Sequence, residues 1–167
     1  MDEVLDKHKQ DFNEIRRLCL LSHGLDLTSS DIFKSSSNYV PSEHTKSVLH
    51  SLLSSTLLNL AVSIRVNLYQ GTIKNELIAL DTLAASYYED DELICKSVHI
   101  KDVCDKIIHA DTVTKPIFPS NFISGDTKMS FQLKGKHGKK AWTLDLCLEL
   151  FAEDILLLLD GIEAENT

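Results

Sequence analysis

The sequence predicts a mainly α protein: a helical bundle of four to five helices with one small β-hairpin before the last helix. Two patterns favour this fold class. Apolar residues recur at three- and four-residue steps along most of the chain, which is the spacing of one helix face. Over about residues 128–146 the spacing changes to alternation, which is typical of paired strands. We expect a single helical domain over residues 1–167, with no internal repeat.

The first two helices are indicated by their ends as well as by their spacing. The first is expected over residues 2–21, with Gly24 stopping it because glycine is common just after helices. The second should begin after Pro41 and Ser42, since proline is tolerated at a helix start and serine caps well. It should continue to Gln70 and extend roughly 42 Å, long enough to be the spine of a bundle.

Three more helices are expected downstream. The third covers residues 72–88 and ends at an acidic turn, the fourth covers about residues 97–110, and the last covers residues 146–161. The hairpin precedes the last helix and has a lysine-rich loop with two glycines. Its alternating apolar positions are Met129, Phe131 and Leu133 on one strand and Trp142, Leu144 and Leu146 on the other.

The charge balance restricts the classes of partner. Seventeen basic residues against twenty-five acidic ones give a formal charge of −8, so nucleic-acid binding would require a local basic patch. The longest uninterrupted apolar run, Ile155–Leu159, is too short to cross a bilayer, and the charged N-terminus does not resemble a signal peptide. We therefore expect a cytoplasmic protein with no membrane partner.

The sequence contains none of the common motifs for cofactors or metals. Phosphate-loop, dinucleotide-binding, serine-hydrolase and zinc-protease signatures are absent. The four cysteines (Cys19, Cys95, Cys104 and Cys147) lack the spacing of a zinc site, and each lies beside apolar residues. We expect free, buried thiols, no metal and no cofactor.

His109 is the first candidate for chemistry. It lies at the expected end of the fourth helix, where an imidazole titrating near neutrality could act as a general acid or base. Asp105 lies one turn earlier and could orient the ring, and Lys106 could neutralise a phosphate. The alternative is a histidine that is stabilised at a helix C-terminus by the helix dipole.

Arg65 is the second candidate, because it borders the apolar stripe of the second helix and therefore requires an acceptor. One interpretation is a structural salt bridge to Asp81, Asp102 or Asp105. The other is a phosphate-binding arginine that faces His109 across the bundle.

The hairpin loop concentrates positive charge in Lys134, Lys136, Lys139 and Lys140, with Trp142 on the adjacent strand. Lysines beside aromatic residues suit single-stranded nucleic acid, which supplies phosphates and stackable bases. The alternative is a solvated loop whose lysines protect exposed strand edges.

Two segments resemble the HEPN superfamily, whose members are small helical bundles of bacterial toxin–antitoxin and phage-defence systems. They are residues 57–66, which contain Arg65, and the helix end at residues 105–110. The resemblance covers about residues 42–161. The family's hallmark is an arginine followed four to six residues later by a histidine, which implies a metal-independent endoribonuclease completed across a homodimer. His109 matches the histidine and Asp105 the polar position, but Cys104 stands where the arginine should be.

Together these features lead to three hypotheses. The first is a catalytically degenerate HEPN-like binding module that forms a homodimer and binds RNA or a partner protein. The second is a metal-independent endoribonuclease that uses His109 with Asp105 and with Arg65 or Lys106. The third is an interaction protein unrelated to the family.

Overall fold

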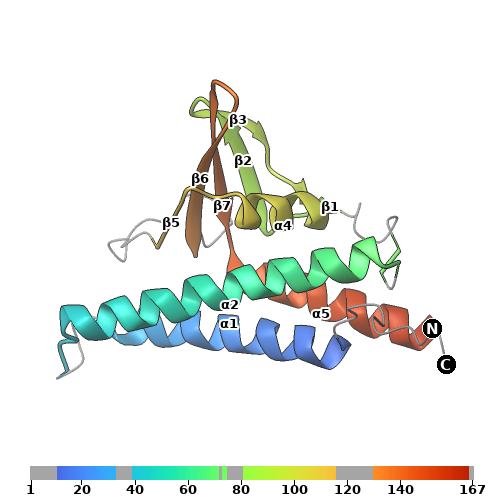
Figure 1. Ribbon diagram of the computed structural model, residues 1–167, viewed down its shortest axis with the longest axis horizontal. Helices are drawn as coiled ribbons and strands as arrows, with labels where there is room; N and C mark the ends of the chain where they lie inside the picture. Colours follow the sequence, from blue (N-terminus) through green and yellow to red (C-terminus); the bar gives the residue numbers. More distant parts are fainter. Residues whose placement is uncertain (1–10, 33–38, 72, 75–80, 116–129, 166–167) are drawn as a thin grey trace, which may run out of the picture.

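The computed structural model describes residues 11–32, 39–71, 73–74, 81–115 and 130–165. Three long helices form its base: α1 (Phe12–Ile32), α2 (Glu43–Tyr69) and α5 (Leu148–Glu165). Helix α1 packs against both α2 and α5. A sheet and a short helix, α4 (Ile100–Ile108), stand on this base (Figure 1).

The main sheet has five antiparallel strands in the order β3-β2-β7-β6-β5. Its strands are β2 (Ala85–Glu89), β3 (Glu92–Cys95), β5 (Thr112–Thr114), β6 (Phe131–His137) and β7 (Lys140–Leu146). A second, two-stranded sheet pairs β1 (Asp81–Thr82) with β4 (Val98–His99). Helix α4 contacts both α2 and β6, so it lies between the helical base and the main sheet.

The expected mainly α bundle is therefore wrong, and the fold is α+β. The error lies in residues 81–99, where a third helix and the start of a fourth were expected but four strands are present. Strands β2 and β3 are joined by Asp90 and Asp91, which both have positive φ, 47° and 65°. Two such residues make the turn whose twist suits a hairpin, so local turn geometry and sheet pairing override the helical spacing.

The helix bounds differ in detail from those expected. Helix α1 continues through Gly24 to Ile32, because its buried face extends beyond that glycine to Asp26 and Ser29. Helix α2 begins and ends close to its expected bounds, and Ser42 caps it by accepting a hydrogen bond from the Thr45 N–H. Residues 2–10, expected as the start of the first helix, lie outside the described residues, as do residues 72 and 75–80 of the expected third helix.

The hairpin before the last helix is confirmed, but it forms the centre of the sheet rather than an isolated pair. Strands β6 and β7 pair from Phe131 with Leu146 to His137 with Lys140. Phe131, Leu133, Leu144 and Leu146 are buried, which puts one face of the hairpin against the core. The other face carries polar side chains, as the alternation predicts.

Helix α2 has an apolar outer face as well as a buried one. Val48, Leu52 and Val62 are 60%, 48% and 38% exposed, and no charged residue occurs between Lys46 and Arg65. Among the described residues, α2 is the one helix long and apolar enough to cross a membrane, and 44% of its most apolar 18-residue stretch is buried. The core helix of a soluble protein meets the same criteria, so the expected cytoplasmic location stays a prediction. The expected homodimer also stays a prediction.

Gly135 provides a test of the hairpin packing. A Cβ at this position would lie 2.3 Å from Cζ2 and 2.6 Å from Cε2 of Trp142, so Gly135→Ala must displace the indole. We expect a loss of about 1–3 kcal/mol in the free energy of unfolding, measured by chemical denaturation. Gly24→Ala is the control: nothing lies within 4 Å of its added Cβ, and we expect a gain of about 0.5–1 kcal/mol in helix α1. An unchanged stability in Gly135→Ala would contradict the packing described.

Candidate functional site

Helix α4 carries the predicted residues Asp105, Lys106 and His109, and it directs them to different surroundings. Its apolar residues Ile100, Val103, Cys104 and Ile107 are buried, which fixes the rotation of the helix. Successive residues of a helix are about 100° apart around its axis, so the adjacent side chains of Asp105 and Lys106 face different elements.

Asp105 faces helix α2 and binds Arg65. The Arg65 Nε lies 2.7 Å from Oδ1 of Asp105, and the two side chains are 31% and 34% exposed. Of the three acceptors considered for Arg65, the structure therefore selects Asp105. This ion pair ties α4 to α2 at the edge of the buried core.

His109 is the C-cap residue of α4, and its side chain is exposed. Its backbone N–H donates to the Asp105 carbonyl oxygen at 3.0 Å. Within the described ranges, no side chain forms a hydrogen bond or ion pair with the imidazole, and the carboxylate of Asp105 is bound to Arg65 instead. The expected orientation of His109 by Asp105 is therefore not present in this structure.

Lys106 faces the sheet. Its Nζ lies 4.7 Å from the centroid of the Tyr87 ring and 4.3 Å from the Trp142 ring, within the range of cation–π attraction. The Tyr87 hydroxyl is 3.4 Å from the same nitrogen. Burial lowers the pKa of Lys106, although the nearby carboxylates of Glu89, Asp102 and Asp105 oppose this shift. The ammonium is thus held in place between α4 and the hairpin.

A pocket of about 230 Å³ opens beside this lysine, and we call it the hairpin pocket. Its described lining residues are Tyr87, Glu89, Lys106, His137, Lys140 and Trp142, from β2, α4, β6 and β7. They include two ammonium groups, one imidazole and one carboxylate. The hairpin pocket is therefore a locally basic site in a chain of charge −8.

Glu89 organises one wall of the hairpin pocket. It accepts a hydrogen bond from the Tyr87 hydroxyl at 3.0 Å and binds Lys140 Nζ at 3.4 Å. The Tyr87 hydrogen bond and then Lys140 lower the pKa of Glu89. Burial, followed by the contact with Glu89, raises the pKa of Tyr87 to about 12. Tyr87 therefore keeps its proton at neutral pH and acts as a donor.

The hairpin lysines do not form a single patch. Strand alternation puts His137 and Lys140 on the face that lines the pocket, as a directly paired couple. Lys134 and Lys136, opposite Thr143 and Ala141, belong to the other face of the sheet. Lys139 is exposed in the turn.

Trp142 is only 3% exposed, so its ring is not free to stack on a base, as the nucleic-acid interpretation of the hairpin loop required. Its indole packs against Gly135 and lies beneath Lys106. The tryptophan therefore forms part of the pocket wall and holds the lysine.

Tyr87, Glu89 and His137 line the hairpin pocket but were not among the site residues expected from the sequence. Tyr87 was assigned to the third helix and Glu89 to the acidic turn that ends it. In the structure Ala85, Tyr87 and Glu89 alternate along β2 and oppose Leu146, Leu144 and Trp142. This two-residue alternation was the signal in the sequence that could have predicted a strand here. His137 was visible among the lysines, but its side of the hairpin depends on the register.

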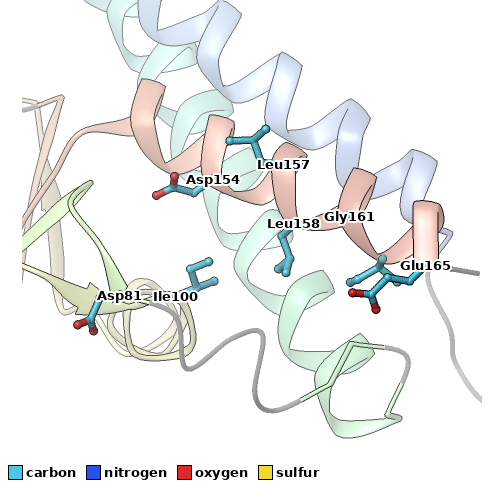
Figure 2. Close-up of a pocket in the computed structure, with 8 residues that line it drawn as sticks. Asp81, Ile100, Asp154, Leu157, Leu158, Gly161 and Glu165 are labelled. Carbon is cyan, nitrogen blue, oxygen red and sulfur yellow. The ribbon is translucent and has the colours of Figure 1, made fainter.

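A second cavity, of about 320 Å³, lies between α5 and the segment formed by β1 and α4 (Figure 2). Its floor is apolar, with Ile100, Leu158 and Ile162. Two of its carboxylates already have partners: Asp81 binds His99 Nδ1 at 2.8 Å, and Asp154 accepts a hydrogen bond from the Thr82 hydroxyl. These partners leave the cavity without a converging set of reactive groups.

The cysteines and metal ligands add no site. All four thiols are free; Cys19, Cys104 and Cys147 are buried and Cys95 is half-buried. Burial raises the pKa of the Cys104 thiol far above its usual range, so it is not a nucleophile at neutral pH. In the described part of the chain, no three His, Cys, Asp or Glu side chains gather as a metal-ligand set.

Comparison with known proteins gives no match: neither a protein-family model, nor a curated protein, nor a solved structure is similar to this chain. The HEPN resemblance therefore stays a prediction that rests on the residues quoted for it.

The Arg65–Asp105 ion pair can be tested by a double-mutant cycle. Arg65→Gln and Asp105→Asn should each destabilise the fold, and their effects should couple by about 1 kcal/mol because the groups are in contact and partly desolvated. Urea denaturation of the four proteins measures this coupling. Asp102→Asn in place of Asp105→Asn is the control, and its effect should add to that of Arg65→Gln within about 0.3–0.5 kcal/mol. Additive effects for the Arg65–Asp105 pair would contradict the contact.

Proposed function

We propose that this protein is a non-catalytic binding module that holds RNA at the β6–β7 hairpin. One observation carries the proposal: in an acidic chain, Lys106, Lys140 and His137 come from three elements and converge on one pocket. Lys139 is exposed in the adjacent turn. The resemblance to bacterial toxin–antitoxin and defence proteins favours the same class of ligand.

The proposed binding is electrostatic rather than based on base stacking. Lysines that neutralise phosphates release condensed counterions, which gives salt-dependent affinity without a sequence preference. Trp142 contributes by fixing Lys106, since its own ring is buried. The acidic remainder of the chain would repel RNA, so the strand is directed to the hairpin.

The test compares two pairs of lysines with equal loss of charge. Lys139→Gln with Lys140→Gln should lower the affinity for single-stranded RNA and reduce the slope of log K against log salt by about 0.7 for each phosphate that is no longer neutralised. Fluorescence anisotropy over a salt series measures both quantities. Lys74→Gln with Lys101→Gln, two exposed lysines outside the pocket, is the matched control and should change the slope little. Equal effects of the two pairs, or binding insensitive to salt, would overturn the proposal.

A metal-independent endoribonuclease is the second candidate. The observation in its favour is the exposed imidazole of His109, one turn beyond the carboxylate that binds Arg65. Under our proposal the wild-type protein leaves RNA intact in the presence of a chelator, and His109→Ala binds RNA as the wild type does. Gel analysis of labelled RNA checks this expectation. Cleavage by the wild type that is abolished in His109→Ala, at unchanged melting temperature, would replace the binding module by the nuclease.

A further inference from the structure

We propose that the hairpin pocket recognises a phosphomonoester, namely the terminal phosphate of an RNA strand, with Lys106 and Lys140 as its cationic ligands and His137 as a further donor. This inference rests on the proposed function and specifies which part of the RNA enters the pocket.

The charge of the pocket suits a monoester better than an internal phosphate. Its described lining has two ammonium groups against the single carboxylate of Glu89, with His137 as an additional donor. A phosphomonoester carries close to two negative charges at neutral pH, whereas each internal phosphodiester carries one. The electrostatic attraction to two ammonium groups is therefore larger for the strand end.

Lys106 is pre-positioned to bind an anion. The Tyr87 and Trp142 rings hold its ammonium group, so binding does not incur the full cost of ordering a long side chain. An ammonium has three N–H donors, and among the described residues only the Tyr87 hydroxyl oxygen is within hydrogen-bond distance of this one. Donors thus remain for an incoming oxygen.

Glu89 already contacts Lys140, at 3.4 Å, and the Lys140 side chain is 67% exposed. A pair this long and this exposed is weak, so a phosphate oxygen can compete for the ammonium. Lys140 can therefore turn to an anion without breaking a buried contact.

The size and position of the pocket favour a chain end. Its volume of about 230 Å³ is smaller than the pockets of roughly 300–1,000 Å³ that enclose drug-sized ligands. It lies near the end of the hairpin that projects away from the three long helices (Figure 1). A terminal phosphate enters such a pocket with one nucleotide attached, whereas an internal phosphate would bring chain on both sides. Because Trp142 is covered by Lys106 and Gly135, the pocket selects for charge and not for the base.

The single tryptophan of the chain gives a direct readout, because Trp142 lines the pocket. Titration with adenosine monophosphate should change its fluorescence in a saturable way, and adenosine should not. Lys106→Gln and, independently, Lys140→Gln should abolish the response. Lys136→Gln, on the opposite face of the same hairpin, should retain it. Melting temperatures identify any variant that fails to fold, and the surface variant Lys140→Gln keeps the test decisive in that case.

A second arm identifies the source of the phosphate. Anisotropy compares one RNA sequence carrying a 5′-phosphate, a 3′-phosphate or hydroxyl groups at both ends. We expect about tenfold tighter binding with a terminal phosphate, the effect of one more charge-assisted hydrogen bond, and a ratio near one in Lys106→Gln. Lys136→Gln, on the opposite face, should keep the tenfold ratio.

The outcomes separate the two proposals. Equal binding of all three RNAs, without a tryptophan response to adenosine monophosphate, overturns the monoester inference and leaves RNA binding standing. A tryptophan response to adenosine monophosphate without binding of any RNA overturns the RNA terminus as the ligand, and with it the proposed function, in favour of a free nucleotide.

Discussion

The packing of α4 between helix α2 and the main sheet is the constraint on which the rest of the molecule depends. A helix of nine residues is too short to be stable alone, so burial of its apolar residues fixes its position. The same burial joins the helical base to the sheet, because α4 contacts both. Without α4 the inner face of the hairpin would lack a cover.

This packing explains why two adjacent residues have different roles. Asp105 turns towards α2 and binds Arg65, while Lys106 turns towards the sheet and lies over Tyr87 and Trp142. The two polar interactions hold the helix on two different faces, about 100° apart around its axis. A shift of α4 by one residue would break both of them, so the hairpin pocket and the junction with α2 are coupled.

In the hairpin, successive side chains point to opposite faces of the sheet, so lysines that are close in sequence lie on different faces. Its lysines are close in sequence, but β pairing assigns Lys134 and Lys136 to one face and Lys140, with His137, to the other. Only the second group meets α4 and the carboxylate of Glu89. The pocket consequently contains only one of the four hairpin lysines, Lys140, and it adds Lys106 and Glu89 from other elements.

The sequence by itself determined the secondary structure that has local signals, namely α2 with its Ser42 cap and the β6–β7 hairpin. It also determined the burial of three thiols and the requirement of Arg65 for an acceptor. It did not determine β1–β4, because the helical spacing of residues 72–88 competes with a strand pattern that depends on long-range pairing: β1 pairs with β4, and β2 pairs with β3 and β7. Nor could it select Asp105 over Asp81 and Asp102, or bring Tyr87 and Glu89 to Lys106. Those choices depend on which elements pack together, and long-range packing is decided by burial in three dimensions rather than by neighbours along the chain.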